Sequence, residues 1–206
     1  MELLEFAPRW AVGIALVLFA IREVWITYNS KNIALESIKK YQEIYKILED
    51  LEEDVNSTRA AFFKGHDSGN PLNGLNKLYS SVIAATSNND ISREFVNKWT
   101  RVRVDNEYIE TIQDIFKNKI ITIYTERLPK GSILRNLYES EGIKCAFAVL
   151  VNVQLENSFL KKITKKPQLI TFSYLSVTFN DLDVDEAYIS ESVRAAANQL
   201  KYVINK

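Results

Sequence analysis

Histidine and cysteine, two side chains that often perform catalysis or bind metals, are nearly absent from this sequence. The 206 residues include one histidine, His66, and one cysteine, Cys145, so imidazole and thiol chemistry depend on these two. Cys/His zinc sites need at least three such ligands, and a disulfide within the chain needs two cysteines. Cys145 falls among Ala and Phe in a predicted strand, where we expect an inert buried thiol. With no G-x-S-x-G, P-loop or dinucleotide-binding motif present, we expect no catalytic residue, no metal and no cofactor.

Charge is balanced over the whole chain but concentrated in two short segments. The 26 basic and 26 acidic side chains cancel, which argues against a nucleic-acid partner, because such proteins carry an excess of Lys and Arg. Asp181, Asp183 and Asp185 precede a predicted helix, and we expect them to cap it. The second segment is basic and contains Lys161, Lys162, Lys165 and Lys166. Two interpretations of it remain open: a solvated turn between strands, or contact with anionic lipid or an acidic partner.

An apolar stretch near the N-terminus has the length of a membrane span. Residues 10–21 are apolar without a break, Arg22 and Glu23 interrupt the pattern, and residues 24–28 resume it. As a helix, residues 10–28 extend about 28 Å, close to the thickness of a bilayer's hydrocarbon core. We expect a retained single-pass anchor there, in contact with the lipid bilayer and preceded by a tail over residues 1–9. The alternatives are a core or interfacial helix and a cleaved signal peptide, and the acidic start argues against the signal peptide.

The ends of this stretch carry the side chains that usually anchor a span. Trp10 lies at one end and Trp25 and Tyr28 at the other, where interfacial aromatic residues belong. Arg22 is close enough to the end for its long side chain to reach the interface. More Lys and Arg residues follow the stretch than precede it, so the positive-inside rule predicts that the C-terminal domain is cytoplasmic.

A connecting helix is predicted over residues 29–56, which contain no Gly or Pro. It carries an apolar seam with heptad spacing, formed by Tyr41, Ile44, Leu48, Leu51 and Val55. Two interpretations remain open: the seam packs on a sheet of the following domain, or it pairs with a second copy of the chain. We expect a homo-oligomer that forms through the span and this helix.

Residues 57–206 are predicted to form one α+β domain. Hydrophobic patterns predict about five strands, over residues 59–64, 78–85, 119–125, 144–155 and 168–179. They also predict helices over residues 105–116, 132–141 and 187–204. This order suits an antiparallel sheet with flanking helices, which we expect to pack on one face.

The segment RAAFFKGHDSGNPLNGLNKLYSSVIA resembles the opening of membrane-anchored GAF-like domains of phage and bacterial sensory proteins. The matching positions are Arg59, Lys64, His66, Asp67, Gly69, Asn70, Pro71, Tyr79 and Ser80. Ser68 departs from the pattern, because a second turn glycine is usual there. The resemblance implies a GAF/PAS-like domain that binds a ligand or an unknown protein partner and has no enzymatic activity. The ligand-binding residues that it implies are His66, Asp67, Asn70, Tyr79 and Ser80.

The layout of the chain is also similar to that of the holins of T-even phages, in which a short tail, one span and a helix precede an α+β domain that ends in a helix. The stretch TFSYLSVTFNDLDVDEAYISESVRAAANQLKYVINK carries this resemblance. It implies membrane lesions for host lysis and a periplasmic soluble domain, in conflict with the charge count. We therefore expect a membrane-anchored, non-enzymatic regulatory or sensory module, with a phage holin as the alternative.

Overall fold

The computed structural model describes residues 9–66, 78–87, 93–155 and 169–206. The chain divides into two compact units, Met1–Gln42 and Glu43–Lys206, which are described separately. One helix, α1 (Arg9–Val55), runs through the end of the first unit into the second. The expected anchor and connecting helix are therefore parts of one continuous helix.

In the first unit, nearly all the described side chains of α1 are exposed, including Arg22, Trp25 and Tyr28. The side chain of Trp10 lies outside the described residues. In the part of the chain that the structure describes, no helix contains a stretch that is long and apolar enough to cross a membrane. The anchor expected over residues 10–28 therefore receives no support from the structure.

The second unit is built on an antiparallel sheet with the order β3-β2-β1-β6-β5-β4. It has six strands instead of the expected five, because the two-residue β3 is too short to leave a pattern in the sequence. The other five strands lie within two residues of their expected bounds. The strands are β1 (Arg59–His66), β2 (Tyr79–Ser87), β3 (Val102–Arg103), β4 (Ile120–Tyr124), β5 (Cys145–Leu155) and β6 (Leu169–Phe179).

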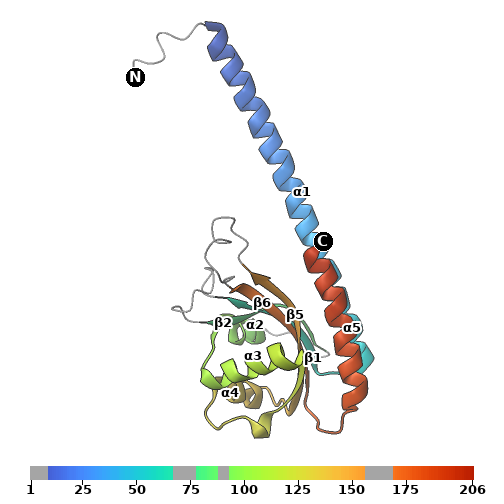
Figure 1. The fold of residues 1–206 in the computed structure, drawn as a ribbon. Coiled ribbons are helices and arrows are strands. Elements are labelled where there is room, and N and C mark those ends of the chain that lie inside the picture. The colour runs from blue at the N-terminus through green and yellow to red at the C-terminus, as the bar shows by residue number, and fades with distance from the viewer. Residues whose placement is uncertain (1–8, 67–77, 88–92, 156–168) are drawn as a thin grey trace. The chain divides into compact units, whose positions relative to one another are not determined.

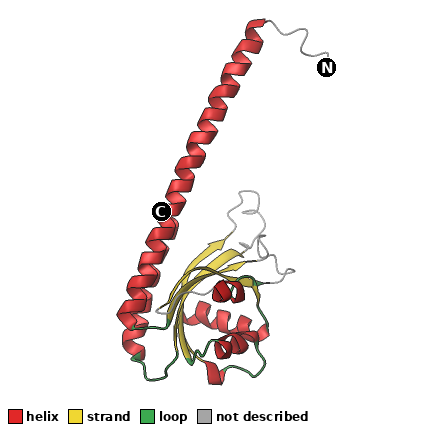
Figure 2. Cartoon of the chain, turned by 180° about the vertical axis from the view of Figure 1, so that it is seen from behind, coloured by secondary structure: helices red, strands yellow, loops and turns green. Residues whose placement is uncertain are grey.

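Helices cover both faces of this sheet, so the expectation that they pack on one face is wrong. Figures 1 and 2 show α3 and α4 on one side of the sheet and α5 on the other. The physical reason lies in the central strands β5 and β6, which are apolar or buried on both sides and must be covered twice. The helices of this unit besides α1 are α2 (Arg93–Lys98), α3 (Asn106–Asn118), α4 (Ile133–Ser140) and α5 (Glu186–Asn205), with a 3₁₀ turn at Thr125–Arg127.

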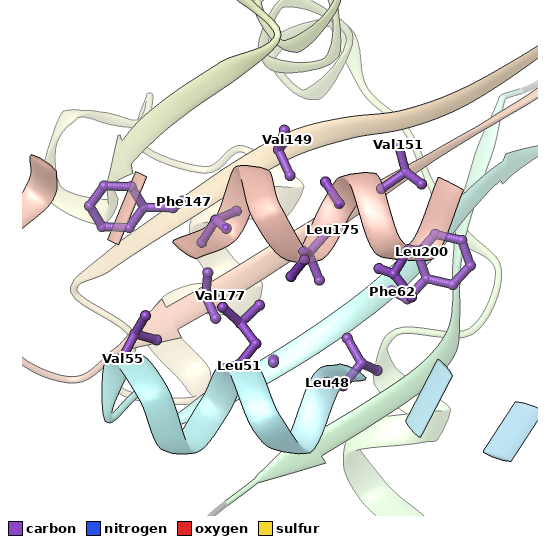
Figure 3. Packing of buried hydrophobic residues seen from close by; sticks show 14 of the residues in the cluster. Leu48, Leu51, Val55, Phe62, Phe147, Val149, Val151, Leu175, Val177 and Leu200 are labelled. Carbon is purple, nitrogen blue, oxygen red and sulfur yellow. The ribbon is translucent and has the colours of Figure 1, made fainter. Parts of the chain in front are cut away.

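The end of α1 belongs to the core between the sheet and α5. Leu48, Leu51 and Val55 point toward Leu175 and Val177 of β6 (Figure 3), and all five belong to one buried cluster. Ile44 belongs to the same cluster. Of the two interpretations of the seam, packing on the sheet is therefore confirmed for residues 44–55. The side chains that are buried in this way and not available to a second copy of the chain are those of Ile44, Leu48, Leu51 and Val55.

Aspartates cap helices α3 and α5. Of the three aspartates expected to cap α5, Asp185 does so, accepting hydrogen bonds from the backbone N–H groups of Ala187 (3.1 Å) and Tyr188 (3.0 Å). Asp181 accepts instead from the N–H groups of Leu182 and Asp183, within the loop. Asp105 caps α3 through the N–H of Tyr108 at 2.9 Å, and its second oxygen accepts from the N–H of Ile133 in α4 at 2.7 Å. One carboxylate therefore holds the first turns of two helices.

Candidate functional site

A small cavity lies between the sheet and helices α2, α3 and α4. It measures about 20 Å³, which is room for about one water molecule. Its walls are almost entirely apolar and aromatic, and they include Phe63, Phe95, Trp99, Tyr108, Tyr138 and Tyr174. All six of these side chains are buried. The cavity therefore has surroundings of low polarity, in which hydrogen bonds and interactions between charges are stronger than in water.

Arg59, one of the residues that line the cavity, belongs to a buried ion pair. Arg59, the first residue of β1, pairs through Nη1 with the Glu141 carboxylate at the end of α4. The other carboxylate oxygen of Glu141 accepts a hydrogen bond from Trp99 Nε1 at 2.9 Å. The Arg59 guanidinium also lies 3.8 Å from the ring centroid of Phe95, which gives a cation–π contact. Side chains from a strand and two helices thus meet at one charged pair.

Three polar atoms at the cavity have no hydrogen-bond partner among the described residues. They are Arg59 Nε, Ser176 Oγ and Thr178 Oγ1, and their residues all line the cavity. The Ser176 hydroxyl is close enough to Tyr138 to affect its pKa, but the two hydroxyls are not in hydrogen-bond geometry. Burial is the main cause that raises the pKa of Tyr138, so its phenol stays protonated.

Two tyrosines of the cavity wall, Tyr108 and Tyr174, belong to a chain of three buried hydroxyls. The Tyr174 hydroxyl is 2.7 Å from Ser80 Oγ and 2.7 Å from the Tyr108 hydroxyl. Burial raises the pKa of both tyrosines, so both remain neutral. Ser80, a residue expected to bind a ligand, is fully buried in this chain. The structure thus gives Ser80 a role in the core, while its role toward a ligand stays a prediction.

The other expected ligand residues lie elsewhere or outside the described residues. His66 and Tyr79 are register partners at the ends of β1 and β2, and neither lines the cavity. His66 Nε2 lies 2.8 Å from Ser81 Oγ, which also accepts from the backbone N–H of Arg101 at 2.9 Å. Asp67 and Asn70, like the lysines of segment 161–166, are outside the described residues. Among the expected ligand residues that the structure describes, His66 and Tyr79 lie side by side.

Cys145 is fully buried, as expected, and belongs to the cluster on the α1 and α5 side of the sheet. Burial raises the pKa of its thiol to about 11, which keeps it protonated and unreactive. A second, more open hollow of about 450 Å³ is lined by residues that include Glu126, Arg135 and Glu139. Arg135 is already held there by Glu139 at 2.7 Å and by the Leu128 carbonyl at 2.7 Å, which leaves the enclosed cavity as the better candidate site.

Solved structures with a similar fold include GAF domains. A GAF domain region from Geobacter sulfurreducens PCA is 16% identical, with a TM-score of 0.51 over 84% of this chain and 98% of its own. A far-red cyanobacteriochrome photoreceptor is 12% identical, with a TM-score of 0.57 over 90% of this chain and 97% of its own. A phycocyanobilin-bound GAF domain from a cyanobacterial phytochrome is 12% identical, with a TM-score of 0.52 over 84% and 88%.

These likenesses confirm the expected GAF-like fold. At identities of 9–16% they concern the fold alone. No protein-family model matches the sequence, and no curated protein matches it.

Proposed function

We propose that this chain is a non-enzymatic regulatory module that binds a small ligand in the cavity between the sheet and α2–α4 and changes the state of α1 in response. The observation that carries the proposal is the position of Arg59. Its side chain lines the cavity, and its backbone begins β1 only a few residues after α1 ends at Val55.

The connection between α1 and the cavity is held tightly to the sheet. The Thr58 N–H donates to the Thr178 carbonyl at 2.9 Å, and the Thr58 carbonyl accepts from Ser87 Oγ at 3.0 Å. Asn56, directly after the helix, has φ 48°, a conformation common where helices end. A displacement of Arg59 by a ligand therefore acts on a short, well-anchored segment and reaches the last turn of α1.

The size of the cavity limits what it binds. Phycocyanobilin, the ligand of one similar GAF domain, is a large tetrapyrrole. A space of about 20 Å³ has no room for it unless the aromatic walls move far apart. We therefore propose a small ligand and not a pigment.

A thermal-shift screen of small molecules on the full chain tests the proposal. Ala148 is buried in the cavity wall, so Ala148→Leu fills the space; Ala148→Val replaces it if the leucine variant does not fold. Ala196→Leu adds the same volume in the core on the α5 side and serves as the matched control. A true ligand raises the melting temperature of the wild type and the control but not that of the filled variant.

The same ligand must also slow amide hydrogen exchange in residues 43–55, because the proposal requires the cavity to act on α1. A ligand that stabilises the filled variant as much as the wild type binds elsewhere, and this result refutes the site. If the ligand binds in the cavity but amide exchange in residues 43–55 does not change, the proposed effect of the ligand on α1 is wrong.

Attachment to a membrane through residues 10–28 stays a prediction, with no support from the described residues. Membrane flotation of the expressed full chain tests it, and recovery in the unbound fraction alone contradicts it. The self-association expected through this segment also stays a prediction. No observation on the described residues favours the holin alternative, so we do not propose it.

A further inference from the structure

The polar atoms of the cavity form one compact group. Ser176 and Thr178 lie two residues apart on β6, so their side chains share one face of the sheet. Arg59 on β1 is the register partner of Thr178. Ser176 and Thr178 are exposed by only 4% and 7%, and in the described part of the chain neither hydroxyl has a hydrogen-bond partner. Since buried polar atoms are normally satisfied, these atoms mark where a polar occupant binds.

The charges around the cavity favour an uncharged occupant. The guanidinium of Arg59 is already neutralised by Glu141, whose side chain is only 8% exposed. An anion would lie near the Glu141 carboxylate, and a cation near Arg59, in surroundings where like charges repel strongly. A neutral molecule avoids both costs.

The donors and acceptors narrow the chemistry further. Arg59 Nε is a donor only, whereas the hydroxyls of Ser176 and Thr178 donate or accept. A carbonyl oxygen can accept from Arg59 Nε–H while an N–H or O–H group of the same molecule donates to a hydroxyl. The volume of about 20 Å³ is little more than the space of one water molecule, so it restricts the occupant to the smallest molecules that carry both groups, with about three non-hydrogen atoms.

We infer that the cavity binds a small uncharged molecule that carries a carbonyl group beside an N–H or O–H group, held by Arg59 Nε, Ser176 and Thr178. This inference rests on the proposed function and specifies the class of its ligand.

Formamide and formate test the inference as a pair, because they have the same number of non-hydrogen atoms and differ in charge. Binding of each to the full chain is measured by saturation-transfer NMR at equal concentration and ionic strength. We expect a saturation-transfer signal from formamide and none from formate.

Two valine variants locate the binding site. Thr178→Val removes the cavity hydroxyl and keeps the shape of the side chain. Thr86→Val is the matched control, because Thr86 is equally buried (7%) but pairs with Ala60 on the opposite face of the sheet. Loss of one neutral hydrogen bond is expected to weaken formamide binding about fivefold in Thr178→Val and to leave it unchanged in Thr86→Val.

The outcomes separate this inference from the proposed function. Formate binding as strongly as formamide, with both lost in Ala148→Leu, overturns the uncharged class but keeps the cavity as a ligand site. Equal weakening in the two valine variants overturns the assignment to Thr178. If neither probe binds, the inference fails, and the wider thermal-shift screen decides the proposed function independently.

Discussion

Replacing Tyr174 by Phe removes the central hydroxyl of the chain Ser80–Tyr174–Tyr108. The substitution keeps the ring, which stacks on Phe63 with the centroids 5.0 Å apart. Two hydrogen bonds of 2.7 Å are lost, and two buried hydroxyls lose their partner.

The expected loss in the free energy of unfolding follows from the number of hydrogen bonds that each substitution removes and the number of hydroxyls that it leaves without a partner. Tyr108→Phe removes one hydrogen bond at the end of the chain, and Tyr174 keeps Ser80, so we expect a loss of about 1 kcal/mol in the free energy of unfolding. Tyr174→Phe removes both bonds and takes the partner from the buried hydroxyls of Ser80 and Tyr108, for an expected loss of about 2–3 kcal/mol. The triple variant with Ser80→Ala, Tyr108→Phe and Tyr174→Phe has no orphaned hydroxyl and loses less than the sum of the single variants.

Urea unfolding followed by far-ultraviolet circular dichroism measures these values. Tyr202→Phe is the control, because Tyr202 is 69% exposed, and it is expected to change nothing. The reasoning is refuted if Tyr174→Phe is no more destabilising than Tyr108→Phe, or if the three losses simply add.

Three other substitutions test the fold. Gly65→Ala places a Cβ against the ring of Phe172, which Phe116 and Tyr174 hold in place, so urea unfolding is expected to show a loss of about 1–3 kcal/mol; unchanged stability would mean that the ring moves freely. Lys119, directly after α3, has a positive φ of 65°, which glycine adopts without strain. In the same assay Lys119→Gly is therefore expected to raise the free energy of unfolding by about 0.5–1 kcal/mol, and the control Lys119→Ala is expected to leave it unchanged. A lower free energy of unfolding in Lys119→Gly contradicts this prediction. Burial is the main cause that raises the pKa of Glu52 above 4.5, with Thr86 and Arg59 opposing, so the folded chain binds this proton more tightly than the unfolded chain and loses stability as pH rises through the raised value. Glu52→Gln is therefore expected to gain stability over the wild type at neutral pH but not below pH 4.5, and an equal difference at both pH values excludes this titration.

Local patterns in the sequence were enough to predict most elements of the domain. β5 and β6 are long and rich in β-branched and aromatic residues, and α5 has a clear apolar stripe behind its Asp185 cap. The six-residue α2 and two-residue β3 were missed because periodicity needs more residues than they have. The distribution of helices over both faces was missed because it depends on how the strands pair and not on any one segment.

The candidate site was much harder to predict. His66 drew attention because it is the only imidazole, yet it lies at the end of a strand and outside the cavity wall. Arg59, which lines the cavity, and its partner Glu141 are 82 residues apart, and nothing near either residue indicates the other. One local signal was present: Ser176 and Thr178 are polar residues within a strand that is otherwise predicted to be buried, and such residues need partners.

The double role of Asp105 couples the first turns of α3 and α4. Its two oxygens hold the N–H groups of Tyr108 and Ile133, so α3 and α4 share a pivot at their first turns. At the other end of α4, Glu141 forms an ion pair with Arg59 and accepts a hydrogen bond from Trp99. Helix α4 is therefore held to α3 at its first turn and to Arg59 and Trp99 at its end. We therefore expect that loss of the Arg59–Glu141 ion pair would release the end of α4, while Asp105 still joins the first turns of α3 and α4.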